Sequence, residues 1–205
     1  MYLVKTPSIV KPLAKEFLWS ISTSEKEIYL TFDDGPTPGV TNKVLDLLKS
    51  FSAHGTFFCL GKNVLAYPDI YQRIRSEGHS VGNHTWDHPD GWKTNDYTYL
   101  KNIARARKVI DTALFRPPYG RITPSQVRAI KNKFQLVMWS VLSADFDKTI
   151  SKEQCLSNVL NNTENGSIIV FHDSEKAKEN MLYALEECLE FFTNEGYTLR
   201  AITQR

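Results

Sequence analysis

Strand-like and helix-like segments alternate along this chain, and the alternation limits the possible folds more than any other feature. Short apolar runs are separated by stretches in which apolar residues recur at helical spacing or a helix start signal is present. Such alternation predicts a parallel sheet with helices packed outside it. The expected strands are residues 27–32, 55–60, 80–83, 114–116, 135–141, 166–172 and 197–202, and the expected helices are 40–51, 68–77, 97–112, 124–133, 151–162 and 177–192.

The length of the chain indicates one domain. Its 205 residues, 41% hydrophobic and 23% charged, fit a globular domain with a sizeable core, and no change in composition marks a linker. Seven strand–helix units predict an α/β fold with a closed or nearly closed barrel, and this one is short because an eight-unit barrel needs roughly 250 residues. We therefore expect an incomplete (β/α)7 barrel over residues 27–205. Residues 1–26 are expected to form a lead-in segment packed on the barrel, with a short helix near 14–19.

Charge and cysteine content exclude several classes of protein. The net charge of +2 is too small to favour nucleic acid or an anionic membrane as a partner. Cys59, Cys155 and Cys188 lie far apart, which argues against a disulfide framework and against a zinc ribbon. No run is long and apolar enough to predict a transmembrane segment, and residues 1–19 lack the apolar core of a secretory signal. The default expectation is therefore a cytoplasmic location. The sequence does not determine the oligomeric state, for which we expect a monomer.

Each notable polar side chain comes just after a predicted strand, always at the same end. In chain order they are Asp33 and Asp34, His84 and His88, Arg116 with Tyr119, Asp145, and His172 with Asp173. Because the carboxyl ends of barrel strands form one face, where active sites lie, we expect these side chains to share a cleft.

Two of these pairs have the chemistry of a hydrolytic metal site. Asp33 and Asp34 lie where a strand ends and the backbone bends, and two carboxylates in one cleft suggest that one holds a metal and the other moves a proton. His84 and His88 are four residues apart, so on a helical turn they would share a face and bind one cation. The alternatives are an ordinary polar turn for the aspartates and surface decoration for the histidines.

A carboxylate joined to the two histidines would leave coordination positions open for water and substrate, which is typical of a catalytic metal site. Zinc is the expected divalent metal, although the same ligands also suit cobalt, nickel or iron. His172 ends an apolar run, and its position alone leaves three roles open: a further metal ligand, a general acid or a buried structural histidine.

Four ordered motifs resemble the polysaccharide deacetylases, which are the NodB-homology domains of carbohydrate esterase family 4. The motifs are Thr31-Phe32-Asp33-Asp34-Gly35-Pro36, His84-Thr85-Trp86-Asp87-His88, Arg116-Pro117-Pro118-Tyr119-Gly120 and Val170-Phe171-His172-Asp173. The resemblance covers about residues 27–202. It implies a distorted (β/α) barrel and a metal-dependent hydrolase that removes acetyl groups from N-acetylated sugars such as chito-oligosaccharides or peptidoglycan.

The resemblance also implies roles for the matching residues at the metal. Asp34, His84 and His88 would hold the divalent cation. Asp33 would be the general base that takes a proton from the attacking water. Arg116 would pair with Asp33 and keep its carboxylate ionised and oriented.

On the other side of the substrate, the backbone N–H of Tyr119 would stabilise the oxyanion and His172 would protonate the leaving amine. Here the sequence departs from the family, because Leu142 stands where the family has an acidic residue that orients this histidine. Phe146 stands in the place of a tryptophan. Either Asp145 replaces the missing carboxylate, or His172 has no carboxylate partner and is a weaker acid.

The departure at Leu142 leaves two alternatives beside the deacetylase. One is a metal-binding, carbohydrate-binding relative with little or no turnover, and the other is an amidohydrolase that acts on a small non-sugar amide. Among the tryptophans, we expect Trp92, in the loop 89–96, to contact substrate, and Trp139, in an apolar strand, to be part of the core.

Overall fold

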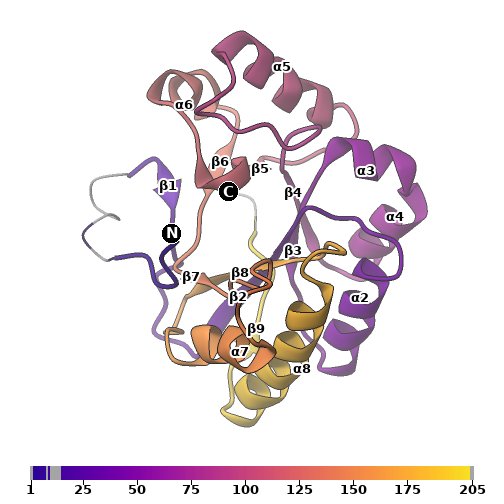
Figure 1. Cartoon of the computed structure of the whole chain (residues 1–205), viewed down its shortest axis with the longest axis vertical. Helices are drawn as coiled ribbons and strands as arrows, with labels where there is room; N and C mark the ends of the chain where they lie inside the picture. Colours follow the sequence, from indigo (N-terminus) through magenta and orange to yellow (C-terminus); the bar gives the residue numbers. More distant parts are fainter. Residues whose placement is uncertain (1, 8, 10–14, 204–205) are drawn as a thin grey trace.

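The structure is a computed structural model, which describes residues 2–7, 9 and 15–203 (Figure 1). Nine strands of the described chain form one curled sheet. They are β1 (Phe17–Leu18), β2 (Glu27–Asp33), β3 (Thr56–Cys59), β4 (Ser80–Asn83), β5 (Leu114–Phe115), β6 (Gln135–Val137), β7 (Val141–Leu142), β8 (Ile168–His172) and β9 (Thr198–Leu199). The spatial order is β1-β6-β5-β4-β3-β2-β8-β7, with β9 paired to β2, and all these named strands pair in parallel.

Helices surround the sheet, as the sequence predicts (Figure 1). They are α2 (Thr41–Ser50), α3 (Gly61–Ala66), α4 (Pro68–Ser76), α5 (Asp96–Arg107), α6 (Pro124–Ile130), α7 (Lys152–Leu160) and α8 (Lys178–Asn194), and a short 3-10 turn, η1 (Pro118–Gly120), follows β5. None of the helices in the described part of the chain is long and apolar enough to cross a bilayer.

The sheet curls almost into a closed barrel because of one bend in the chain. The sequence predicts a single strand over residues 135–141, but the structure divides it into β6 and β7, which lie toward opposite ends of the strand order. Residues 138–140 therefore cross from one side of the sheet to the other. The predicted fold class, a distorted and incomplete barrel, is confirmed.

The lead-in segment contributes extended backbone rather than helix. The predicted short helix near 14–19 is wrong over its described residues, since Phe17–Leu18 pair with β6 as β1. Lys5 also bridges Val141 in antiparallel fashion, with Thr6 N–H donating to the Ser140 carbonyl (2.9 Å). The division of the chain at residue 26 stays a prediction.

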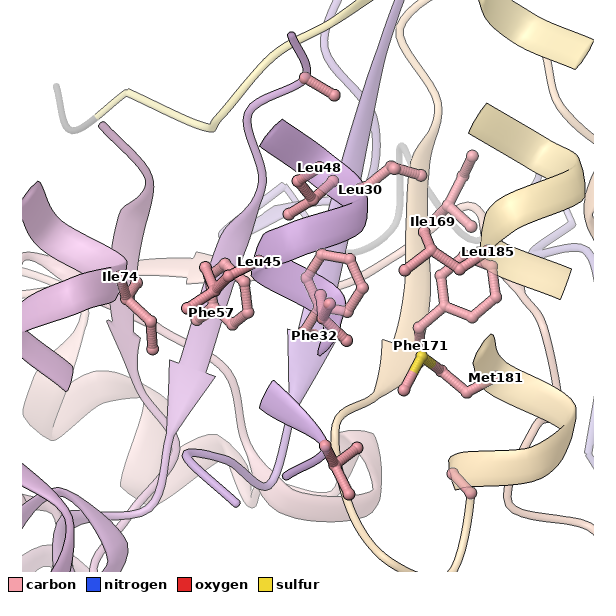
Figure 2. Packing of buried hydrophobic residues seen from close by; sticks show 14 of the residues in the cluster. Leu30, Phe32, Leu45, Leu48, Phe57, Ile74, Ile169, Phe171, Met181 and Leu185 are labelled. Atoms are coloured by element: carbon pink, nitrogen blue, oxygen red, sulfur yellow. The ribbon is translucent and has the colours of Figure 1, made fainter. Parts of the chain in front are cut away.

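The main core lies between the sheet and helices α2, α4 and α8 (Figure 2). Phe32 of β2 is fully buried and stacks on Phe57 of β3, with ring centroids 4.8 Å apart, and on Phe171 of β8 at 6.2 Å. Leu45 and Leu48 of α2 cover these rings from outside. Each such buried side chain contributes about 1.5–3 kcal/mol relative to exposure, so the strands that carry the polar residues rest on a rigid apolar layer.

Candidate metal centre and active site

Strand register brings the predicted polar residues to one place. In the β2–β8 pair, Asp33 lies opposite His172, and in the β4–β5 pair Asn83, which precedes His84, lies opposite Phe115, which precedes Arg116. A cavity of about 990 Å³ lies at this carboxyl face. Its lining includes Asp33, Asp34, His84, His88, Tyr119 and His172.

Asp34, His84 and His88 form a cluster with the geometry of a metal site. One ligand atom from each lies within 4.8 Å of the other two. Asp34 Oδ1 is 3.3 Å from His88 Nε2 and 3.8 Å from His84 Nε2. The same Oδ1 atom is buried and has no hydrogen-bond partner among the described residues, an arrangement that costs free energy unless a cation satisfies it.

The hydrogen bonding and charge of the two histidines also fit a metal. His84 Nδ1 lies 2.8 Å from the Arg116 carbonyl, and because a carbonyl only accepts, Nδ1 donates and Nε2 is the nitrogen that faces the cluster. Burial, together with the neighbouring His84, lowers the pKa of His88 to about 4, so its ring is neutral. One divalent cation therefore fits these three side chains.

The two histidines do not lie on a helical turn, the arrangement in which their spacing would place them on one face. They lie in a loop after β4, in which Thr85 and His88 have φ angles of 71° and 68°. Side chains stabilise this unusual backbone, since Asn83 Oδ1 accepts from Thr85 N–H (2.8 Å) and Thr85 Oγ1 accepts from His88 N–H (3.1 Å). The spacing of four residues thus brings the imidazoles together through a hydrogen-bonded turn, with ring centroids 5.0 Å apart.

Asp33 lies beside the cluster and forms an ion pair with the guanidinium of Arg116. Its Oδ2 is 4.0 Å from His84 Nε2, and its Oδ1 accepts a 2.7 Å hydrogen bond from Arg116 Nη1. Burial alone would raise the pKa of Asp33, but the charges of Arg116, His84 and His172 and the hydrogen bond outweigh it, so the pKa lies below its usual value. Asp33 is an ionised carboxylate at neutral pH.

Arg116 is fully buried and its guanidinium is fixed by several partners. Besides Asp33, it donates to Thr31 Oγ1 (2.7 Å) and to the carbonyls of Val137 (3.2 Å) and Met138 (2.9 Å). The guanidinium of Arg116 therefore connects β2 with the segment after β5 and with the end of β6. These contacts hold it in one orientation toward Asp33.

His172 does have a carboxylate partner, and it is Asp145. The Nδ1 atom of His172 lies 2.7 Å from Asp145 Oδ1, and its backbone N–H donates to Asp145 Oδ2 (2.7 Å). Burial would lower the pKa of His172, but the charge and hydrogen bond of Asp145 raise it to about 9. Leu142 is buried against Val170 of β8 and lines the cavity without a polar role.

Asp173, which the sequence motif contains but to which we assigned no role, positions the turn that carries Asp34. Its carboxylate is buried and accepts hydrogen bonds from Gly35 N–H (3.0 Å) and Thr41 Oγ1 (2.6 Å). It thereby holds the turn in which Asp34 adopts a φ of 82°. Burial, and then the charge of Asp34, raise the pKa of Asp173 to about 8.

The remaining wall of the cavity is largely aromatic and apolar. Trp92 lines it and is 65% exposed. Trp139 is only partly buried and also lines it, so its prediction as a core residue holds only in part. Tyr2 and Leu3 of the lead-in segment also reach this wall, which no pattern in the sequence indicates. Tyr2 is fixed there by a 2.6 Å hydrogen bond to Asp147.

The fold and the arrangement of this site match those of the polysaccharide deacetylase family. Residues 20–139 match the family described as polysaccharide deacetylase, so the chain belongs to that family.

Known proteins of similar sequence and structure carry related names. The chain is 39% identical over 158 residues to a peptidoglycan-N-acetylglucosamine deacetylase of Bacillus cereus, covering 74% of this chain and 57% of that protein. It is 35% identical over 191 residues to a peptidoglycan-N-acetylmuramic acid deacetylase of Bacillus subtilis, covering 90% of this chain and 40% of that protein. The chain thus spans about half the length of these two curated relatives.

A solved structure is similar over almost its full length. It is a crystal structure of a peptidoglycan N-acetylglucosamine deacetylase in complex with 4-naphthalen-1-yl-N-oxidanyl-benzamide. The TM-score is 0.87 at 32% sequence identity, and the match covers 96% of this chain and 95% of the other. The whole barrel is therefore shared, including the strands that carry the site.

Proposed function

We propose that this chain is a metal-dependent hydrolase that removes acetyl groups from N-acetylated sugars of a glycan, such as peptidoglycan or chito-oligosaccharide. One observation carries the proposal: an ionised carboxylate and a protonatable imidazole lie opposite each other on adjacent strands, Asp33 on β2 and His172 on β8. Their pKa values are shifted in opposite directions, and the three-residue cluster lies at their side. The names of the relatives agree with this chemistry.

Asp34, His84 and His88 would hold the cation, with zinc as the expected metal and cobalt or nickel as alternatives. When bound, a divalent cation supplies acidification of water and polarisation of the acyl carbonyl. The chain's own residues provide the proton transfers.

Asp33 accepts the proton of the attacking water on Oδ2, the oxygen that faces His84. Its other oxygen stays bonded to Arg116, which prevents the carboxylate from rotating and keeps it ionised. The backbone N–H of Tyr119 is proposed to donate to the oxyanion.

His172 donates the second proton. Because Nδ1 is bound to Asp145, Nε2 is the atom that faces the cavity and protonates the leaving amine. The products are acetate and a free amino sugar. At neutral pH the base is deprotonated and the acid protonated at the same time, which is the requirement for such a pair.

The low-turnover alternative depended on a catalytic histidine without a carboxylate partner. The 2.7 Å contact between His172 and Asp145 removes that argument.

Acetate release from N-acetylglucosamine oligomers and from peptidoglycan fragments tests the proposal. The metal-loaded protein is expected to release acetate, and Asp33→Asn, which keeps the shape of the side chain, is expected to lower kcat by about 10²–10⁴. Asp46→Asn, at an exposed aspartate of α2, is the matched control and should keep the parent rate. No release from any acetylated glycan, or an unchanged rate in Asp33→Asn, would contradict the proposal.

A further inference from the structure

The lead-in segment pairs with the strand that comes just before the carboxylate partner of His172. That strand, β7, ends the order of strands in the sheet and has β8 on one side. On its other side, Leu142 N–H donates to the Val4 carbonyl (2.8 Å), and Lys5 bridges Val141 in antiparallel fashion. The lead-in segment therefore covers backbone groups that an edge strand would otherwise leave unpaired.

The side chain of Tyr2 extends this contact to the residues that follow β7. Its hydroxyl donates to Asp147 Oδ2 (2.6 Å). The other oxygen of Asp147 accepts from the backbone N–H and the hydroxyl of Thr149 (2.9 and 2.6 Å), so this carboxylate is itself held in place. The Tyr2 ring packs edge-on against Phe146, with centroids 5.5 Å apart. A hydrogen bond and a ring contact thus hold Tyr2 against two consecutive residues.

Phe146 in turn packs against the imidazole of His172. The centroids of these two rings are 5.2 Å apart, and the ring planes meet at 82°. Asp145 binds Nδ1 of the imidazole, but a hydrogen bond at one nitrogen still lets the ring swing about that atom. An aromatic side chain packed against the ring restricts this movement. Tyr2, Phe146 and His172 therefore form a row of three rings that ends at the proposed general acid.

We propose that Tyr2 is a positioning residue for His172, because it supports the Phe146 ring and, through that ring, the orientation of the imidazole. The inference rests on the proposed function, in which His172 protonates the leaving amine, and it gives the lead-in segment a part in that reaction. Misplacing a catalytic group by about 1 Å can cost about 10²-fold in rate. Losing one indirect support should cost less, about three- to tenfold in kcat.

Kinetics distinguish positioning from direct contact with substrate, since Tyr2 also lines the cavity. Acetate release from the tetramer of N-acetylglucosamine is measured with the zinc-loaded protein. Tyr2→Ala should lower kcat about three- to tenfold and leave KM unchanged, and Tyr2→Phe, which keeps the ring, should restore most of the rate. In a Phe146→Ala background, Tyr2→Ala should have no further effect, because the support acts through that ring. A raised KM with unchanged kcat, or full additivity of the two substitutions, would overturn the inference.

A second measurement does not depend on turnover. The zinc-loaded protein is prepared with isotope-labelled histidine, and the ring signals are followed by NMR. Because the ring-current shift of an imidazole depends on its distance and angle to a neighbouring aromatic ring, Tyr2→Ala should move the His172 signal toward its position in Phe146→Ala. The signals of His54 and His79 should stay in place, since neither residue is part of the cavity lining in the described chain.

Tyr67→Ala is the matched control, because Tyr67 is 40% exposed, close to the 38% of Tyr2, and lies at the end of α3, outside the described cavity lining. It should leave both kcat and the His172 signal as in the parent. A His172 signal that does not move in Tyr2→Ala would overturn the inference, even if the rate falls. A signal that moves as expected, in a protein whose parent releases no acetate, would support the positioning of His172 and contradict the proposed reaction.

Discussion

Replacing Asp145 by asparagine should move the pH dependence of the reaction in a defined direction. Asp145 raises the pKa of His172 from 6.5 to about 9, against the effect of burial. The protonated imidazole therefore persists at neutral pH and is lost as the pH rises through about 9. In Asp145→Asn the negative charge is gone, while burial, the largest single effect, still lowers the pKa of His172 and exceeds each of the remaining charges of Asp34 and Asp33 that raise it, so this pKa should fall below 6.5.

The size of the effect follows from these two pKa values. At pH 7.5 more than nine-tenths of His172 is protonated when its pKa is about 9, and less than about a tenth when its pKa is below 6.5. The amide of asparagine also forms a weaker hydrogen bond with the His172 imidazole, so the orientation of this general acid is less well defined. Because a positioned general acid contributes about 10²–10⁴ in rate, we expect kcat at pH 7.5 to fall within that range.

The assay is the pH profile of kcat for acetate release, combined with an NMR titration of the His172 ring. The parent should lose activity on the basic side near pH 9, and Asp145→Asn should lose it below pH 6.5. Asp111→Asn, at an exposed aspartate after α5, is the control and should keep the parent profile. An Asp145→Asn enzyme whose basic limb stays near pH 9 would refute the role given to Asp145.

Three further substitutions test other parts of the site and fold. Arg116→Met leaves the Asp33 carboxylate buried without its cation and should lower the free energy of unfolding by about 3–5 kcal/mol in denaturant titrations, and an unchanged midpoint would contradict this. Gly35→Ala places a Cβ 2.0 Å from Asp173 Oδ2, so the turn that carries a metal ligand must shift. Metal affinity, measured by competition with a chromophoric chelator, should fall about 10–100-fold, whereas parent-like affinity would count against the role of that turn. Ser151→Ala removes the N-cap of α7 and should lower stability by about 1 kcal/mol in thermal unfolding, with acetate release unchanged. A changed rate would mean that α7 acts on the site.

Most of the fold is readable from the sequence because its signals are local. The run before Asp33 is apolar enough for a strand buried on both faces, and Thr123 followed by Pro124 marks a helix start that the structure shows with a full capping box. The short helix α3 was missed, since six residues without a side-chain cap show no clear period. The bend that separates β6 from β7 depends on contacts across the closing barrel, which no local pattern contains.

The sequence predicts which site residues lie at the ends of strands, but not which of their side chains are in contact. The order of motifs placed Asp34, His84 and His88 at one face, and the structure brings them together. The sequence left open whether Asp145 reaches His172, because that contact depends on a φ of 61° at Ala144, a conformation that is not apparent in the sequence.

The central claim is that one divalent cation is held by Asp34, His84 and His88 beside Asp33. The most direct test is elemental analysis of the protein after zinc loading and exhaustive dialysis, together with Asp34→Ala and His88→Ala. The account predicts one zinc ion per chain in the parent and little or none in either variant. A parent that retains no metal, or variants that retain as much as the parent, would contradict it.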